Sequence, residues 1–476
     1  MQTYQTMQLG QNRGRPRVWL QGKRPALAGF TPGVRFQLVT ESDRIALRIS
    51  ADGERTVSSK TVGDKVIPVI DINSAEALAV FEGLTELRVV MRESEILILP
   101  TATEKRVRER TDRLLNKLRA GEPLTVGALA YGGGILDHAL HSGMADAGIH
   151  TELAFANEIR EDLAEHAAQH NPMFTDKTIS LVAPMQELAW DEAGMHRLPK
   201  VDLLVAGIPC SGASLSGRAK RGLALPEEHP LVGHLIAPAI AFIAKVAPFA
   251  VVIENVPSYA NTASAAILRT QLKDLGYDVH ERELRGTDFG DLENRNRWCF
   301  VAVTRGCELG IEQILAAPGV QRTLADVLEP LDAVADRWSP MTGLKAKQER
   351  DMEAGKGFKM QVYRGDETVI NTLTKGITKN RSTDPKFQHP ENPELLRIPK
   401  AVEHARIKGV PEELITGLSE TTAHELLGQG ICYSPFRALG KHLAQALKRF
   451  EVNYMSQART VLDRIAHKPN AALVAG

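Results

Sequence analysis

A short apolar run that ends in a proline and a cysteine constrains this chain more than any other feature. Residues 202–208, Asp-Leu-Leu-Val-Ala-Gly-Ile, lead directly into Pro209-Cys210-Ser211-Gly212. Such a run is typical of a buried parallel strand. The turn after a parallel strand lies at the carboxyl edge of an open α/β sheet, where ligands bind. The sequence therefore predicts a thiol at a ligand-binding edge.

Two further strand candidates adjoin charged residues. Val251-Val252-Ile253 precedes Glu254-Asn255-Val256-Pro257, and Glu293-Asn294-Arg295-Asn296-Arg297 precedes the apolar run at 298–303. These strand ends would bring together a nucleophile, an acid and a cationic clamp. Strand and helix patterns alternate from Leu124 to about Arg305, which predicts an α/β fold with a doubly wound, Rossmann-like parallel sheet.

The ordered set of motifs resembles that of DNA cytosine-5 methyltransferases, from about Leu124 to the C-terminus. Members of that family carry a Pro-Cys loop, a Glu-Asn-Val strand end and a Gln-x-Arg-x-Arg segment, whose Gln is Glu293 here. The resemblance implies that Cys210 is the nucleophile that adds to carbon 6 of a flipped-out cytosine. It also implies that Glu254 lies near cytosine N3, and that Arg295 and Arg297 lie near the thiolate, the base or the phosphate.

A glycine-rich turn follows the strand candidate at 124–129 and precedes a helix predicted from Ile135. The next strand, at 153–156, ends in Asn157-Glu158, where an acid can hydrogen-bond a ribose. In the family this is the S-adenosyl-L-methionine site, and the resemblance implies cofactor contacts from Tyr131, Gly132, Gly133, Gly134, Glu158, Pro209 and Gln429.

The cofactor side departs from the family pattern in three places. Tyr131 stands where Phe-x-Gly-x-Gly-Gly has its first glycine, and a tyrosine lacks the backbone freedom of glycine. Gln429 replaces the Asn of a Gly-Asn pair, and no acid near residues 179–181 matches the family's adenine contact. These departures leave open a weakened or altered methyl-donor site.

Double-stranded DNA is the partner that the resemblance implies. The polar, basic residues 211–230 are predicted to form a mobile loop that closes over DNA. The net charge is zero, but residues 13–24 hold five Arg or Lys and no acid, and residues 341–400 hold twelve Arg or Lys against eight acids. A local basic surface suffices for phosphate contact, although a solvated face explains either segment equally well. The predicted DNA contacts in the loop are Ser214, Ser216, Arg218, Lys220 and Arg221.

The chain is expected to have five parts. Residues 1–100 form a β-rich domain with two halves that look alike, residues 101–120 a helical linker, and residues 121–305 the catalytic domain. Residues 306–411 form a smaller target-recognition domain, and residues 412–476 return to the catalytic domain through a helix at 436–450. Apolar runs predict N-terminal strands at 34–39, 45–49, 66–70, 87–90 and 96–99.

The stretch 18–33 resembles SymE-like, AbrB-type swapped-hairpin proteins. Such small folds often dimerise and some bind DNA. The resemblance therefore implies homodimerisation through the N-terminal domain, added DNA contact, or both. A small β appendage without a binding role is the alternative.

Composition excludes several classes of protein. The four cysteines fit neither a disulfide framework nor a common zinc site, and the pair of His166 and His170 is typical of a solvated helix face, so no metal is expected. No apolar run reaches the length of a membrane helix, and the N-terminus lacks a signal peptide's apolar core. We expect a cytoplasmic protein, associated with the nucleoid in a bacterial or phage-infected cell.

Three functions remain open at this point. The first is methylation of carbon 5 of cytosine in DNA from S-adenosyl-L-methionine, as in restriction-modification. The second is the same chemistry on RNA or a free nucleotide, against which the long segment 306–395 argues. The third is a DNA-binding regulator with an inactive methyltransferase core. Tyr131 and Gln429 motivate that function, whereas Cys210, Glu254 and Arg297 argue against it.

Overall fold

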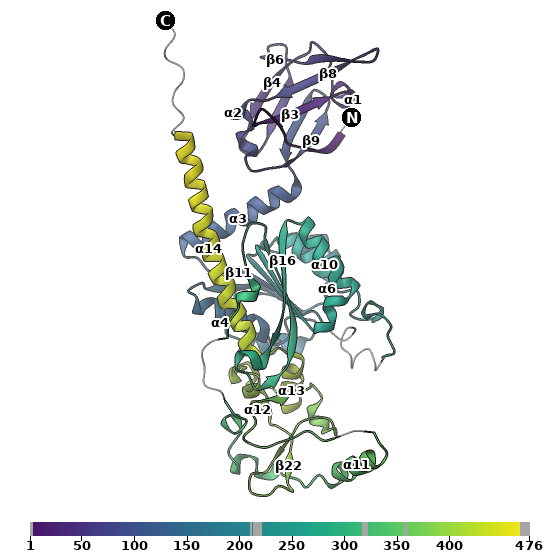
Figure 1. Cartoon of the computed structure of the whole chain (residues 1–476), viewed down its shortest axis with the longest axis vertical. Coiled ribbons are helices and arrows are strands. Elements are labelled where there is room, and N and C mark those ends of the chain that lie inside the picture. The colour runs from purple at the N-terminus through teal and green to yellow at the C-terminus, as the bar shows by residue number, and fades with distance from the viewer. Residues whose placement is uncertain (1–2, 210–211, 213–220, 317–321, 357–358, 467–476) are drawn as a thin grey trace. The chain divides into compact units, whose positions relative to one another are not determined.

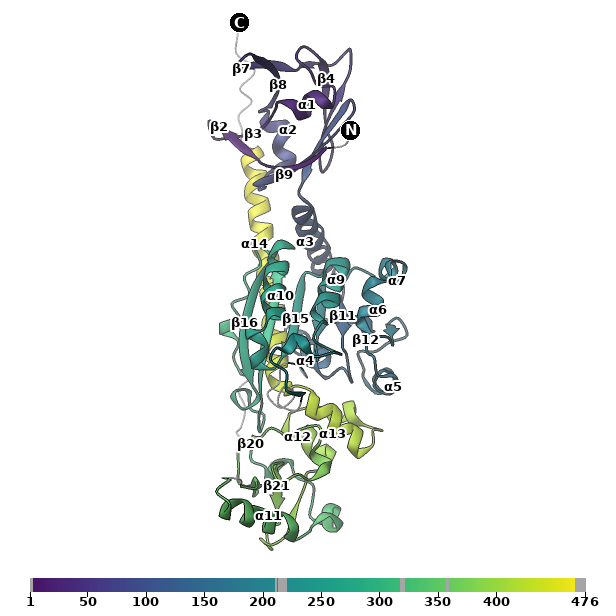
Figure 2. The ribbon, with the colours of Figure 1, turned by 90° about the vertical axis from the view of Figure 1, so that its right-hand side faces the viewer.

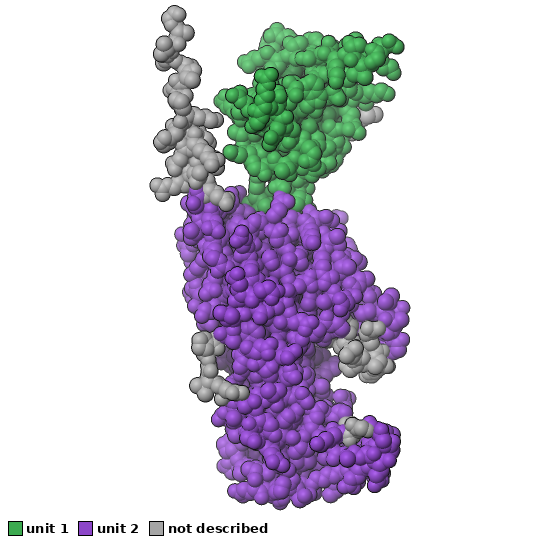
Figure 3. All heavy atoms as spheres, viewed as in Figure 1, with its two compact units in different colours: residues 1–109 green, residues 110–476 purple. Residues whose placement is uncertain are grey.

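The computed structural model describes residues 3–209, 212, 221–316, 322–356 and 359–466. The chain divides into two compact units, residues 1–109 and residues 110–476 (Figure 3). The division falls inside helix α3 (Ala102–Ala120), at the position predicted for the linking helix. Among the helices of the described residues, none has both the length and the apolarity needed to cross a bilayer.

Unit 1 is built from two antiparallel sheets around one apolar core. A six-stranded sheet has the order β1-β9-β10-β5-β4-β6, and a four-stranded sheet has the order β2-β3-β8-β7. The five predicted apolar runs match β4, β5, β8, β9 and β10. Strands β1, β2, β3, β6 and β7 were not predicted, because each is short or mostly polar. The elements are β1 (Thr3–Gln8), β2 (Gly10–Asn12), β3 (Arg15–Gln21), α1 (Lys23–Leu27), β4 (Arg35–Thr40), β5 (Ile45–Ile49), β6 (Arg55–Thr56), β7 (Ser58–Val62), β8 (Lys65–Ile72), α2 (Ala75–Leu78), β9 (Glu86–Arg92) and β10 (Glu95–Pro100).

Unit 2 contains a seven-stranded sheet with the order β13-β12-β11-β14-β15-β18-β16. The first five strands in this order are parallel, and β18 runs antiparallel to both β15 and β16. The predicted doubly wound α/β sheet is therefore confirmed. The strands are β11 (Leu124–Leu129), β12 (Thr151–Asn157), β13 (Ile179–Leu181), β14 (Leu203–Ala206), β15 (Ala250–Asn255), β16 (Tyr277–Arg285) and β18 (Asn296–Thr304).

Helices cover both faces of this sheet (Figures 1 and 2). Helices α4 (Ile135–Asp146) and α14 (Tyr433–Ala466) contribute to the apolar cluster on one face. Helices α6 (Met185–Trp190), α9 (Ile236–Val246) and α10 (Ala263–Asp274) contribute to the other. The last helix is longer than the predicted 436–450, because Pro435 fits a first helical turn and the polar residues after 450 are compatible with a helix.

A smaller part of unit 2 follows the sheet in sequence and has its own apolar cluster. It contains α11 (Thr342–Glu353) and the short strands β19 (Val362–Tyr363), β21 (Lys386–Gln388) and β22 (Leu396–Arg397). Strand β20 (Ile370–Asn371) pairs with β17 (Glu293–Asn294) just before β18. The chain then forms α12 (Ala401–Ile407) and α13 (Glu420–Gln429) before it enters α14.

Candidate active site

One edge of the seven-stranded sheet collects the strand ends that the sequence singled out. Strands β12, β11, β14 and β15 are neighbours and parallel, so their carboxyl ends lie together. Strand β18 runs in the opposite direction, so its first residues lie at the same edge. The edge therefore presents the glycine turn after β11, Glu158 after β12, Pro209 after β14, Glu254 at the end of β15 and Arg297 near the start of β18.

Glu254 and Arg297 form an ion pair at this edge. The Nε of Arg297 lies 2.7 Å from Oε1 of Glu254, and the two side chains are 13% and 12% exposed, respectively. The pairing register sets Glu254 opposite Cys299, two residues beyond Arg297 on the adjacent strand. A guanidinium held against a carboxylate orients it, and partial burial strengthens the attraction. The pair can therefore present an oriented acid at the carboxyl edge of the sheet.

The loop after β14 is tied to the same place by Asn255. Its Nδ2 donates to the carbonyl oxygen of Ile208 at 3.1 Å, and its Oδ1 accepts the Val256 N–H at 2.9 Å. Pro209, the next residue, is exposed. Of the other predicted residues of this loop, Arg221 is exposed. Five fall outside the described residues: Cys210, Ser214, Ser216, Arg218 and Lys220.

Arg295 has a different environment from Arg297. Its guanidinium is 4% exposed, and Nη2 donates to the carbonyl oxygens of Gly428 at 3.0 Å and Gln429 at 3.2 Å. These are the last residues of α13, where helix carbonyls lack intrahelical donors and favour a cation. Only Arg297 of the two predicted arginines joins Glu254, whereas Arg295 fixes the helix end that carries Gln429.

Glu293, at the position of the family's Gln, lies in a closed polar network. Oε1 accepts the Leu373 N–H at 2.8 Å and Oε2 lies 2.8 Å from Nζ of Lys408; both charged side chains are fully buried. Burial acts to raise the pKa of Glu293, but the charges of Lys408 and Arg295 outweigh it and hold that pKa below its ordinary value. Sequence reasoning did not single out Lys408, which lies 115 residues away in the chain.

Glu158 braces the glycine turn. Its Oε2 accepts the Gly132 N–H at 2.7 Å and its Oε1 accepts the Arg160 N–H at 2.9 Å. Each oxygen keeps a second lone pair with which a hydroxyl group could bond. A Cβ at Gly132 would have a single neighbour within 4 Å, Leu426 at 3.8 Å, so the backbone is open to close approach here. A carboxylate beside open backbone at a helix N-terminus fits the ribose and polar groups of S-adenosyl-L-methionine.

Tyr131 does not need the backbone freedom that the family's glycine has at this position. Positive φ in this turn occurs at Ala130, Gly132 and Gly134, but not at Tyr131, so no left-handed conformation is required of the tyrosine. Its ring is buried edge to face against Phe174, with ring centroids 6.2 Å apart. A Cβ at Gly134 would lie 2.4 Å from the tyrosine ring. Tyr131 therefore fills the space beneath the turn that Gly134 leaves.

Helix α13 lies over the same turn. A Cβ at Gly133 would lie 2.7 Å from Cδ2 of Leu426, so the glycine makes room for this side chain. Gln429 ends the helix and is exposed. The structure thus brings the turn and Gln429 together through α13, across almost 300 residues of sequence.

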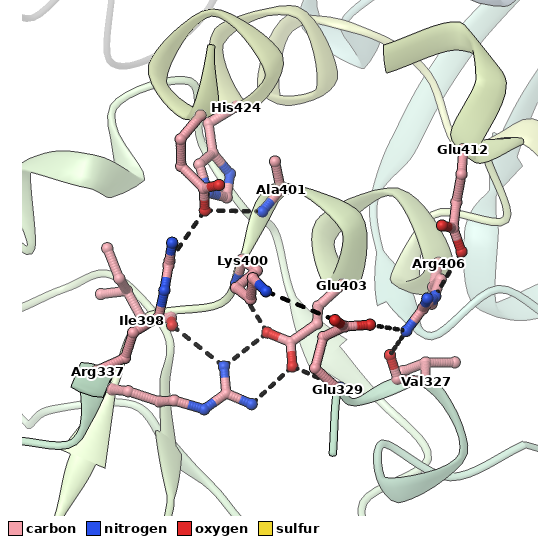
Figure 4. Close-up of polar contacts among 12 residues, drawn as sticks. Val327, Glu329, Arg337, Ile398, Lys400, Ala401, Glu403, Arg406, Glu412 and His424 are labelled. Carbon is pink, nitrogen blue, oxygen red and sulfur yellow. Dashed lines mark hydrogen bonds and ion pairs between the residues drawn. The ribbon is translucent and has the colours of Figure 1, made fainter. Parts of the chain in front are cut away.

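A charged network holds α12 and α13 to residues 327–337 (Figure 4). Arg397 and Glu403 form two hydrogen bonds of 2.6 Å, and both are buried. Glu403 also accepts the backbone N–H groups of Glu329 and Lys400, each at 2.8 Å. Arg337 lies 3.0 Å from Glu420 at the start of α13. These contacts link the smaller part of unit 2 to the helix that covers the glycine turn.

Comparison with known proteins points to one family. The family model for C-5 cytosine-specific DNA methylase matches residues 125–445. Type II methyltransferase M1.ScrFI of Lactococcus lactis subsp. cremoris is 25% identical over 53% of this chain and 64% of its own length, just under two thirds. Type II methyltransferase M.NlaX of Neisseria lactamica is 25% identical over 52% of this chain and 78% of its own.

Solved structures agree on the fold. The S. pombe Dnmt2 methyltransferase superimposes with a TM-score of 0.52 and 19% identity, over 68% of this chain and 99% of the other. The Entamoeba histolytica methyltransferase EhMeth has a TM-score of 0.52 at 15% identity, over the same shares. At these identities the likeness concerns the fold alone.

Proposed function

The chain belongs to the C-5 cytosine-specific DNA methylase family, and we propose that it methylates carbon 5 of cytosine in double-stranded DNA. The Glu254–Arg297 pair carries this proposal, because it presents an oriented acid where the sheet edge meets the Pro-Cys loop. S-adenosyl-L-methionine would supply an electrophilic methyl group. The Gly132 backbone, Glu158, Pro209 and Gln429 are the residues that would hold this cofactor.

In the proposed chemistry Cys210 acts as a thiolate. It adds to carbon 6 of the cytosine, which makes carbon 5 nucleophilic enough to take the methyl group. Glu254 donates or shares a proton at N3 and offsets the charge that develops during addition. Loss of the carbon-5 proton to a base and expulsion of the thiolate then restore the aromatic ring. Arg297 acts here by keeping the Glu254 carboxyl group in place.

The target base must leave the DNA stack before this chemistry can take place. We propose that the loop at 211–230 contacts the DNA around the flipped base, with Ser214, Ser216, Arg218, Lys220 and Arg221 as the contacting residues. The smaller part of unit 2 would read the flanking sequence, and the network around Glu403 would transmit its position to α13. Arg295 would keep the end of α13, with Gln429, next to the cofactor turn.

Bisulfite sequencing of DNA from cells that express the protein tests the proposal, because it reports activity and target sequence together. We expect methylated cytosines in one short sequence context, and none with Cys210→Ser. Purified wild-type protein should also form a covalent complex with a target duplex that contains 5-fluorocytosine, since fluorine cannot leave as a proton does. Unmethylated DNA together with no covalent complex on that duplex would contradict the proposal.

A further inference from the structure

Both sheets of unit 1 have a palindromic strand order. Residues 3–49 and residues 54–100 each contain three strands, a short helix and a hairpin, in that order. Exchange of the two segments converts β1-β9-β10-β5-β4-β6 into β6-β4-β5-β10-β9-β1, which is the same sheet read backwards. The order β2-β3-β8-β7 behaves in the same way. Residues 3–49 are therefore called repeat 1 and residues 54–100 repeat 2.

The strand registers show the same symmetry. In the hairpin of repeat 1, Phe36 pairs with Ile49, and in repeat 2 Leu87 pairs with Pro100. Both partners are shifted by 51 residues, since 87 − 36 = 51 and 100 − 49 = 51. Two hairpins with one register and one offset indicate a repeated structural unit.

The repeats complete each other's sheets. Strand β5 pairs with β10 so that Leu47 lies opposite Ile96 and Ile45 opposite Ile98, and exchange of the repeats turns the first pair into the second. Ala46 lies opposite Leu97, its own counterpart in the other repeat, because 97 − 46 = 51. A pseudo-two-fold axis therefore passes between Ala46 and Leu97.

The outer strands are exchanged between the repeats. Strand β1 of repeat 1 pairs with β9 of repeat 2, and β6 of repeat 2 pairs with β4 of repeat 1. Equivalent core positions are apolar and buried in one cluster that contains Phe30 and Phe81, Phe36 and Leu87, Ile45 and Ile96, and Leu47 and Ile98. A single repeat of under 50 residues would leave β3 and β5 as open edges and keep half of this core.

The two repeats have equivalent core residues but differ in their surface charges. The turn and helix of repeat 1 carry the exposed cations Arg13, Arg15, Lys23 and Arg24. The corresponding turn of repeat 2 carries Asp64 beside Lys65, and α2 carries Glu76. The repeats are therefore no longer interchangeable on their surfaces, as expected for two copies that are fixed in one chain.

We propose that residues 3–100 are a tandem duplication in which each repeat is the partner that the other would otherwise take from a second copy of the chain. The unit is closed by intrachain pairing of β5 with β10 and of β3 with β8. It does not mediate the homodimer that the N-terminal resemblance implied. The unit instead offers one basic surface per chain.

A cysteine pair across the axis tests this in the full chain. Ala46→Cys with Leu97→Cys places two thiols at directly opposed positions, and all four native cysteines lie at residue 210 or later. Mild oxidation should give a disulfide within one chain. The oxidised protein should keep the mass of a monomer, and its digest should contain a peptide pair that is linked through the two new cysteines. The two single variants are the controls. A disulfide-linked dimer that needs both cysteines would overturn the proposal.

Light scattering on the unmodified chain is the second measurement and does not depend on how the cysteine variant folds. The oligomeric state should be the same with and without residues 1–109, from low to high micromolar concentration. A dimer that becomes monomeric when these residues are deleted would overturn the proposal. Self-association that survives the deletion belongs to unit 2 and agrees with a closed N-terminal unit.

Discussion

Lys408 lies with its ammonium group 2.8 Å from the carboxylate of Glu293, and both side chains are completely buried. The same carboxylate accepts the N–H of Leu373 in the smaller part of unit 2. Lys408 also contacts the carbonyl oxygen of Gly430, just after α13. One buried ion pair therefore joins the sheet edge, the smaller part of unit 2 and the helix that covers the glycine turn.

Glu293→Gln, which restores the family's residue, should destabilise the protein. The substitution leaves the ammonium group of Lys408 buried without its counter-charge, at a cost of about 3–5 kcal/mol. Lys408→Met in the Glu293→Gln background removes that charge and should recover most of the loss. A double-mutant cycle by chemical denaturation measures the coupling. Additive effects of the two substitutions would show that the pair is not coupled.

Glu254→Gln should lower methyl transfer by about 10²–10⁴-fold with little change in melting temperature, because the proposed role of this acid is in the chemistry and its side chain is not part of the apolar core. Single-turnover methylation of a target duplex measures the rate. Arg297→Lys should also slow the reaction, since a lysine cannot reproduce the guanidinium geometry.

Arg295→Lys is the matched control for Arg297→Lys. Arg295 is buried against the end of α13, so the melting temperature of Arg295→Lys should fall further than that of Arg297→Lys. Reversed effects at the two arginines would contradict the roles assigned to them.

Tyr131→Gly should destabilise the glycine turn, although it restores the family's glycine. Removal of a buried aromatic ring costs about 3–5 kcal/mol, and here it empties the space beneath Gly134. Tyr131→Phe keeps the ring and should retain both stability and cofactor affinity. Calorimetric titration with S-adenosyl-L-methionine compares the variants. Tighter binding by Tyr131→Gly would mean that the tyrosine obstructs the site.

Asp137→Asn should stabilise the protein, and the gain should grow with pH. Burial raises the pKa of Asp137 to about 8, whereas an unfolded aspartate has a pKa of about 4. Between these values the unfolded chain has lost a proton that the folded chain keeps, so stability falls as pH rises. The gain from Asn should increase by at most roughly 1.4 kcal/mol per pH unit between pH 5 and 8. A gain independent of pH, in thermal melts across this range, would show that Asp137 has an ordinary pKa.

A variant that begins near Arg110 should still methylate its target, because the sheet edge lies wholly in unit 2. Its DNA affinity should depend less steeply on salt. The slope of log affinity against log salt concentration should be shallower by about 0.9 for each DNA phosphate that the shortened protein no longer neutralises. In the full chain, Arg13→Ala with Arg15→Ala should reproduce part of this change. Lys60→Ala with Lys65→Ala, from repeat 2, is the matched control and should leave the slope unchanged. Equal effects of both pairs would show that the basic surface is not confined to repeat 1.

The sequence by itself determined the strands of the seven-stranded sheet and which motif residues lie at their ends. Apolar runs predicted β11, β14 and β15, and the polar residues directly after them predicted a site at one edge. The strand predictions and the grouping of these residues at one edge succeed because a buried parallel strand is marked by its own residues, and because parallel strands share a carboxyl edge. The position of Glu254 at that edge follows from its place in the chain.

Only the tertiary structure decided which of these residues meet. Arg295 and Arg297 look equivalent in the motif, yet one binds the end of α13 and the other binds Glu254. Lys408 finds Glu293 from 115 residues away, and Tyr131 turns inward because Gly134 leaves room for its ring. The physical reason is that side-chain direction and long-range partners depend on how separate segments pack, and no local pattern of residue types records that packing.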